Sequence, residues 1–131
     1  MSRPPVAVTI SFIDAINRRD LDALCDLMSE DHSLEVITEP PLTGRDDNEE
    51  AWDGYFSSFP NYVIYPRRIC EQEPGVVAVL GHTTGSHLEL PDEDEAKLTL
   101  MWVAHVDDGL VTRWRLLEDT IEARRKYGFS D

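Results

Sequence analysis

The chain of 131 residues is the size of one domain, over residues 1–131, that can bury a hydrophobic core. Its 12 lysines and arginines face 26 aspartates and glutamates, which gives a formal net charge of −14 at pH 7. Such an acidic surface repels phosphate backbones and anionic headgroups, so we expect no nucleic acid and no membrane among its partners. The sequence has no signal-peptide core and no apolar run of about 18 residues, and we therefore expect a cytoplasmic protein.

Residues that commonly bind metals are scattered along the chain. Cys25 and Cys70 form no CxxC pair, and neither has a histidine at metal-binding spacing. The acidic runs 46–50 and 92–95 lack the alternating oxygen ligands and turn glycine of a calcium loop. We expect solvated surface charge in both runs, free thiols in a reducing compartment, no metal and no cofactor.

Helices are predicted for much of the first half. A stripe of apolar residues with helical period runs through residues 6–18, and Asp20 can cap a second, shorter helix. Two prolines and a glycine then indicate a loop before a third helix. The predicted elements are helices over 6–18 and 20–28, a strand over 32–38, and a helix from Asp46 or Asp47 to about Ser58.

Strands are predicted for the second half. A strand over 62–71 contains Pro66, which lacks a ladder donor and indicates an edge strand or a bulge. A long strand follows over 76–90, and its odd and even positions are both apolar, so the pattern leaves open which face points inward. The tail over 122–127 is predicted as a last helical turn.

The run 97–121 has the strongest local signal in the chain. Two strands flank Asp108-Gly109, a dipeptide that favours a tight hairpin turn. Alternation with a period of two places one apolar face and one polar face on this hairpin. The apolar positions are Leu98, Leu100, Trp102, Ala104, Val106, Leu110, Trp114 and Leu116. We expect the function to be carried out over this apolar face.

Three helices followed by antiparallel strands predict an α+β domain, in which the N-terminal helices pack on a curved, mainly antiparallel sheet. The helices and a pocket would fill the inner face. The outer face would then need another cover, and we expect a second subunit there, in a homodimer. The residues predicted for this contact are Val103, His105, Arg113, Arg115 and Leu117.

Four segments, taken in order, resemble the nuclear transport factor 2-like (NTF2-like) superfamily. FIDAINRRDLDAL at 12–24 resembles its opening helix pair, and YFSSFPNY at 55–62 resembles its helix–strand joint. GHTTG at 81–85 and DGLVTRW at 108–114 resemble its polyketide-cyclase-like, or SnoaL-like, branch. The resemblance covers roughly residues 6–125 and implies a cystatin-like cone with a deep apolar pocket, usually in a homodimer.

The catalytic groups of three enzyme classes in this superfamily are missing here. Ketosteroid isomerases use a Tyr and two Asp residues, and SnoaL-type cyclases use an Asp and a His. Limonene-epoxide hydrolases use the same Asp as the cyclases, together with an Arg and a second Asp. The matching positions are Phe12, Val36 and Trp102 for the isomerases, Leu116 and Trp102 for the cyclases, and Thr83 and Gly85 for the hydrolases. The resemblance therefore predicts the fold and excludes these catalytic sets.

Two residues remain as candidates for acid–base chemistry. Glu118 follows Trp114 and Leu116 on the same strand face, where an apolar surrounding would raise the pKa of a carboxyl. Alternatively, Glu118 lies in water at the strand end. His82 can act as a base or bind a ligand carbonyl, although a histidine with a purely structural role is also compatible with a long strand.

Two functions are compatible with these features. The first is an apolar small-molecule pocket, with or without cofactor-free proton transfer of the isomerase, cyclase or dehydratase type. The second is a non-catalytic dimeric module for ligand binding or interaction, whose pocket its own side chains partly fill. The predicted lining is Phe12, Ile16, Trp52, Tyr55, Phe59, Leu100, Trp102, Trp114 and Leu116.

Overall fold

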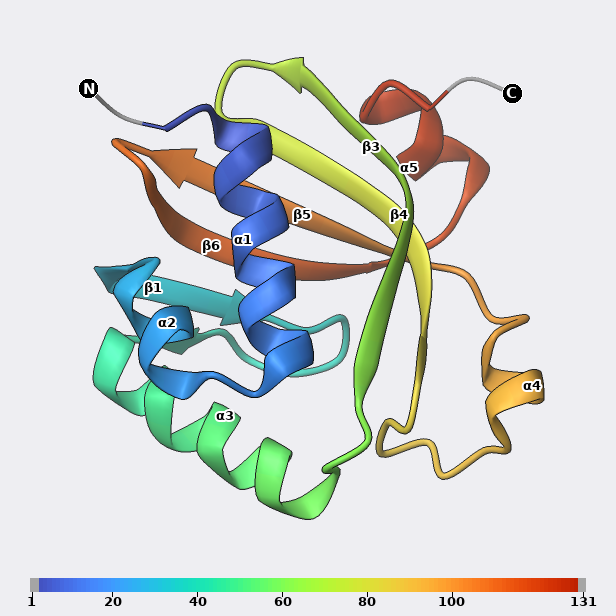
Figure 1. Ribbon diagram of the computed structural model, residues 1–131. Helices are drawn as coiled ribbons and strands as arrows, with labels where there is room; N and C mark the ends of the chain where they lie inside the picture. The colour runs from blue at the N-terminus through green and yellow to red at the C-terminus, as the bar shows by residue number, and fades with distance from the viewer. Residues whose placement is uncertain (1–2, 130–131) are drawn as a thin grey trace.

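The computed structural model describes residues 3–129, in which helices pack on a six-stranded sheet (Figure 1). The sheet order is β2-β1-β6-β5-β4-β3, and of the neighbouring pairs only β1 and β6 run parallel. The elements are α1 (Pro5–Arg18), α2 (Leu21–Asp26), β1 (Met28–Glu35), β2 (Leu42–Thr43), α3 (Arg45–Ser58), β3 (Val63–Glu73), β4 (Val76–Thr84), α4 (Asp92–Glu95), β5 (Leu100–Asp107), β6 (Leu110–Glu118) and α5 (Ile121–Lys126). The α+β prediction, with helices on a curved, mainly antiparallel sheet, is confirmed.

The two N-terminal helices follow from local signals. Pro5 stands in the first turn of α1, where its missing N–H costs no helical hydrogen bond. Arg19 adopts a left-handed conformation with φ of 54°, which ends α1. The Asp20 carboxylate then accepts a hydrogen bond of 3.1 Å from the Ala23 N–H and caps α2.

The second helix ends sooner than predicted, at Asp26. The Leu27 carbonyl accepts a hydrogen bond of 2.7 Å from the Val111 N–H, so the chain already pairs with β6 at this point. Met28 consequently begins β1 instead of ending α2, and the prediction of helix as far as residue 28 is wrong.

The predicted hairpin is confirmed in β5 and β6. Trp102 lies opposite Leu116 and Ala104 lies opposite Trp114. Asp108 and Gly109 have φ of 51° and 77°, the left-handed values that a tight Asp-Gly turn requires. Through β5 and the second half of β6, the apolar face of this hairpin lies toward the helices, as the alternation predicts. The prediction is wrong for Leu110, because a register shift between His105 and Val106 brings Val111 into the inner cluster in its place.

Two apolar clusters lie on opposite sides of the sheet. The inner cluster joins the helices to β5 and β6 and contains the large buried rings Phe12, Trp102 and Trp114. The smaller outer cluster joins β4 and β5 to the C-terminal residues and consists of Ala78, Leu80, Met101, Val103 and Phe129. The strands β4 and β5 are thus buried on both faces, which explains why the odd and even positions of β4 are both apolar.

The segment between β4 and β5 differs from the prediction. β4 ends at Thr84, six residues early, because Gly85 turns the chain with φ of 69°. A Cβ at Gly85 would lie 2.4 Å from the Asn61 carbonyl oxygen, so only glycine fits this close approach. β5 begins at Leu100, and Leu98, predicted on the apolar face, is 47% exposed outside the strand.

Pro66 behaves as predicted, because β3 is an edge strand of the sheet and its pairing with β4 shifts register between Pro66 and Arg68. The tail also forms the predicted helical turn, as α5. β2 is a two-residue addition to the prediction, paired with β1 inside the region predicted as a loop.

Candidate functional site

The nine predicted lining residues all belong to, or pack against, the inner cluster. Phe12, Ile16, Trp52, Trp102 and Trp114 are buried within it. Tyr55, Phe59, Leu100 and Leu116 are only partly buried and form its outer layer. The structure therefore brings the predicted residues together, and their side chains contact one another across the space predicted for a pocket.

A buried carboxylate lies at one end of this cluster. Glu95, the last residue of α4, is 1% exposed, and no other Asp, Glu, Lys or Arg between residues 3 and 129 is buried. The Thr83 hydroxyl and, at 3.4 Å, the Ser86 N–H donate hydrogen bonds to its two oxygens. These donors offset part of the cost of removing a carboxylate from water.

The Glu95 carboxylate reaches the inner side of the sheet. Val77 and Val79 of β4 pack in the inner cluster. Side chains alternate along a strand, so Thr83, also at an odd position of β4, lies on the same face. The hydrogen bond to Thr83 thus holds the carboxylate at the edge of the same apolar cluster that the helices cover. The sequence predicted this placement, an acid beside the apolar face of the sheet, for Glu118.

Two phenols lie near this carboxylate. Burial raises the pKa of Tyr62, with smaller contributions from Tyr55 and from the negative charge of Glu95, so the Tyr62 hydroxyl keeps its proton. Among the described residues, no hydrogen bond reaches this hydroxyl. The Tyr55 hydroxyl, in contrast, accepts from the His87 N–H at 3.2 Å and lies 2.9 Å from His87 Nδ1.

A second unpartnered donor is the indole of Trp52, whose Nε1 is buried with no hydrogen-bond partner among residues 3–129. Its ring lies 6.1 Å from that of Tyr55, and the Tyr55 ring lies 5.0 Å from that of Tyr62. Buried polar atoms normally find partners, so the Trp52 Nε1 without one is notable. This N–H and the Tyr62 hydroxyl can both donate to a ligand that carries an acceptor oxygen.

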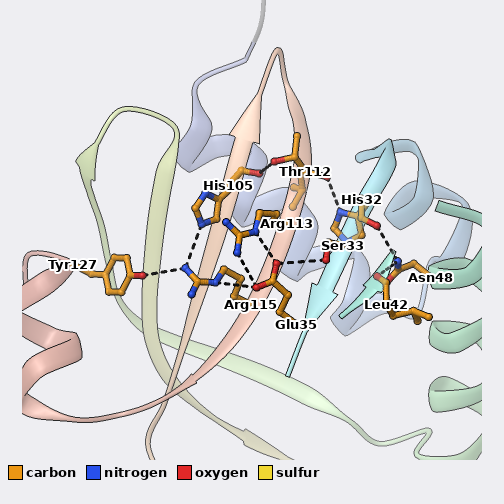
Figure 2. Close-up of polar contacts among 11 residues, drawn as sticks. His32, Ser33, Glu35, Leu42, Asn48, His105, Thr112, Arg113, Arg115 and Tyr127 are labelled. Atoms are coloured by element: carbon orange, nitrogen blue, oxygen red, sulfur yellow. Dashed lines mark hydrogen bonds and ion pairs between the residues drawn. The ribbon is translucent and has the colours of Figure 1, made fainter. Parts of the chain in front are cut away.

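His32 is a further buried polar group that the sequence did not single out. Its Nδ1 lies 2.7 Å from the Val111 carbonyl oxygen, and since a carbonyl can only accept, Nδ1 carries the proton. Burial lowers the pKa of His32, so the ring is neutral near pH 7 and Nε2 holds a free lone pair. His32 lies beside Phe12 in the middle of β1, and Figure 2 shows it next to Asn48.

The two predicted catalytic residues lie on different strands, β6 and β4, and His82 is close enough to Glu95 for the charge of that carboxylate to act on its ring. Glu118 ends β6 opposite Leu100, and its side chain is exposed. His82 is at an even position of β4, like Ala78 and Leu80, and therefore lies on the outer face of the sheet. Its ring stacks on Tyr65 at 4.7 Å and lies 3.1 Å from the Nε of Arg67.

Sequence reasoning did not find Glu95, because it stands last in the run Asp92-Glu93-Asp94-Glu95 that was interpreted as solvated charge. That interpretation is wrong for this residue alone. The three acids before it are exposed, and the single turn of α4 directs only Glu95 toward β4. A run of four acids contains no local signal that distinguishes the buried one.

Surface hollows lie elsewhere. One lies beside Gln72, Glu73, Lys126 and Tyr127, another is lined by Glu30 and residues 44–47, and a third by Asp22, Cys25, Asp26, Arg45 and Glu49. None of these three includes a predicted lining residue. Burial and neighbouring acids raise the pKa of Cys25 to about 11, so its thiol is a poor nucleophile.

Comparison with known proteins identifies the family. Residues 10–114 match the sequence profile of the SnoaL-like domain. The chain belongs to the SnoaL-like domain family. No curated protein matches the chain with significance in sequence, so the family is known from this profile.

Solved structures share the fold of this SnoaL-like chain. An uncharacterised cystatin-fold protein from Novosphingobium aromaticivorans has a TM-score of 0.75 at 14% identity and covers 89% of this chain and 100% of its own. A proposed polyketide cyclase from Sinorhizobium meliloti has a TM-score of 0.70 at 19% identity, covering 85% and 94%. TerC, co-crystallised with polyporic acid, has a TM-score of 0.72 at 18% identity, covering 94% and 97%. At these identities the likeness concerns the fold alone.

The SnoaL-like domain offers no grouped metal ligands in its described part: over residues 3–129, no three of its His, Cys, Asp and Glu side chains lie close enough together to bind an ion. The helices within that range are also too short or too polar to cross a membrane.

Proposed function

We propose that this SnoaL-like domain binds a small, largely apolar molecule between the inner cluster and Glu95, and carries out cofactor-free proton transfer on it. The reaction class is isomerisation, cyclisation or dehydration. The observation that carries the proposal is the burial of the Glu95 carboxylate, at 1% exposure, on the inner side of the sheet. One positioned acid or base beside an apolar site is sufficient for this chemistry.

The surrounding groups have complementary roles in the proposal. Glu95 moves the proton, while the Tyr62 hydroxyl and Trp52 Nε1, which lack partners among the described residues, donate hydrogen bonds to an oxygen of the ligand. A donor that keeps its own proton stabilises negative charge as it develops on that oxygen. The partly buried Tyr55, Phe59, Leu100 and Leu116 are the side chains that a ligand would displace on entry.

Glu118 and His82 remain predictions as catalytic residues. Their places at an exposed strand end and on the outer face support the assignment of the central role to Glu95 instead. The test below therefore includes Glu118 as a competing residue.

The test uses 2-naphthol, an apolar phenol that becomes a strong acid when excited. A base within hydrogen-bond distance takes its proton and shifts its emission to the longer wavelength of the naphtholate. We expect bound 2-naphthol to show this band with the wild-type protein and to lose most of it with Glu95→Gln. 2-Methoxynaphthalene, which has no proton to give, should bind without the band.

Glu93→Gln is the matched control, because Glu93 lies in the same helical turn but is exposed. It should keep the wild-type band. Loss of the band with Glu118→Gln and not with Glu95→Gln would transfer the role to Glu118. Binding without a naphtholate band in the wild-type protein would overturn the proton-transfer proposal.

One observation favours a second function, a non-catalytic binding or interaction module. The nine lining side chains already contact each other in a single cluster, as a pocket filled by its own residues would. Under this alternative, an interaction module would bind neither 2-naphthol nor polyporic acid at millimolar concentration, and a ligand-binding module would bind 2-naphthol without the naphtholate band.

A further inference from the structure

Three buried polar atoms between α3 and β1 have no hydrogen-bond partner among residues 3–129. They are Nε2 of His32, Oδ1 of Asn48 and Nε1 of Trp52. The exposed fractions of the three residues are 0%, 0% and 7%. Leaving one such atom without a partner costs about 1–3 kcal/mol, so three of them in one part of the core are unusual.

The three residues are neighbours in the fold. The Asn48 amide donates a hydrogen bond of 3.2 Å to the backbone carbonyl of His32, which joins α3 to β1 (Figure 2). Trp52 follows Asn48 by about one helical turn, so both side chains leave the same face of α3. The His32 ring lies 5.8 Å from the ring of Phe12 in the inner cluster, and Trp52 packs in that cluster too.

The other contacts of Asn48 fix the orientation of its amide. Besides the His32 carbonyl, the backbone carbonyl oxygens of Leu42 and Gly44 lie 3.0 and 2.9 Å from Nδ2. Carbonyl oxygens can only accept, so the amide nitrogen must face them. The amide oxygen Oδ1 consequently faces away from these carbonyls and is a free acceptor.

His32 supplies a second acceptor, and Trp52 supplies a donor. The Nδ1 proton of His32 is directed at the Val111 carbonyl, which leaves a lone pair on Nε2. Burial lowers the pKa of His32, so the ring keeps this lone pair at pH 7. The Trp52 indole N–H can only donate. The three atoms together therefore require a partner that gives two hydrogen bonds and takes one.

This requirement selects the bound molecule by its chemistry. The Trp52 N–H would repel a metal ion or an ammonium group, and the two acceptors would repel an anion. An alcohol hydroxyl has a single proton and would satisfy only one of the acceptors. A water molecule has two protons to give and lone pairs to receive a third hydrogen bond, which is the usual number for a buried water.

We propose that His32, Asn48 and Trp52 bind one internal water molecule, which donates to His32 Nε2 and Asn48 Oδ1 and accepts from Trp52 Nε1. Each hydrogen bond spans about 3 Å, so one water joins atoms that are too far apart to bond directly. The water connects α3 to β1, and the bond from His32 to Val111 extends the connection to β6. A ligand oxygen that accepts from Trp52, as in the proposed function, would replace one of the three bonds and leave two.

The first test uses the full chain, labelled with nitrogen-15 and free of ligand. A water held inside the protein gives the Trp52 indole proton cross-peaks of opposite sign in water-selective NOE and ROE spectra, whereas surface water does not. Trp52→Phe assigns the indole signal by removing it. The cross-peaks should persist in Tyr55→Phe, because the Tyr55 ring lies 6.1 Å from that of Trp52 and its hydroxyl proton could imitate water.

The second test counts long-lived water by oxygen-17 relaxation dispersion. His32→Phe removes the Nε2 acceptor and fills its place with an apolar ring, so we expect the dispersion to lose the amplitude of one water molecule. The matched control is His82→Phe, the same substitution at a histidine on the outer face, which should keep the wild-type amplitude.

Absence of the opposite-sign cross-peaks from the wild-type spectra, or their loss in Tyr55→Phe, would overturn the proposal. Equal dispersion amplitudes for wild type and His32→Phe would also overturn it, because the long-lived water would then lie elsewhere. If His32→Phe does not fold, the wild-type spectra decide. None of these measurements involves 2-naphthol, so they stay separate from the test of the proposed function.

Discussion

The Thr83 hydroxyl of β4 donates a hydrogen bond to the Glu95 carboxylate of α4, and this contact ties the segment between β4 and β5 to the inner face of the sheet. The segment forms no ladder with the sheet, so its other fixed points are side-chain contacts. These are the pair Tyr55 and His87, and a hydrogen bond of 3.0 Å from Arg67 to the Ala96 carbonyl. The position of the proposed acid–base residue therefore depends on Thr83.

Thr83→Val tests this dependence. The change keeps the shape of the side chain but leaves a buried carboxylate with one donor fewer, so it should lower the free energy of unfolding by about 1–3 kcal/mol. Thr83→Ser keeps the hydroxyl and should cost less than Thr83→Val. Urea denaturation at pH 7 measures both, and equal stability of the two variants would show that the hydrogen bond contributes nothing.

Tyr62→Phe should separate binding from stability. Because no described residue bonds the Tyr62 hydroxyl, its removal should change the free energy of unfolding by no more than about 0.5 kcal/mol. Tyr55→Phe removes a hydroxyl that does bond His87, and should cost about 0.5–1.5 kcal/mol. The affinity for 2-naphthol should nevertheless fall with Tyr62→Phe, which isothermal titration can measure. An unchanged affinity would remove Tyr62 from the proposed site.

His32 should make stability depend on pH in a defined window. Burial lowers the pKa of His32 in the folded protein below the value of about 6.5 that it has when unfolded. Above pH 6.5 neither state binds the proton, and the full stability is present. As the pH falls from 6.5 toward the folded pKa, only the unfolded state gains the proton, so stability is lost at up to about 1.4 kcal/mol per pH unit.

His32→Gln removes this titration and keeps a donor for the Val111 carbonyl. The difference in unfolding free energy between wild type and variant, measured from pH 7 to pH 5, isolates His32 from the other histidines. A difference that stays constant over this range would contradict the prediction.

Gly81→Ala tests the close pairing of β3 and β4. A Cβ at Gly81 would lie 2.2 Å from the Tyr65 backbone oxygen, so the strands must separate. We expect a loss of about 1–3 kcal/mol or more, measured by thermal unfolding. The control is Gly54→Ala on α3, where nothing lies within 4 Å of the new Cβ. This change should stabilise the helix by about 0.5–1 kcal/mol.

The order and type of most elements could be predicted because their signals are local. The Asp20 cap, the Asp108-Gly109 turn and the Pro66 edge each depend on the conformation of a few neighbouring residues. The alternation in the hairpin is also local, and it correctly placed Trp102 and Trp114 toward the helices. The bounds of α2, β1, β4 and β5 differ from the prediction. The start of β1 and the end of β4 are set by distant contacts, with Val111 and with Asn61.

The sequence by itself determined the α+β fold and the residues of the apolar face of the hairpin, because the period of the apolar residues indicates which face of each element is buried. The tertiary structure alone decided where the charged groups lie. Glu95 and Glu118 are both acids near apolar runs, yet the turn of α4 buries the first and the end of β6 exposes the second. Burial of a single polar side chain depends on what packs over it, and the residues that cover it are far away in the chain.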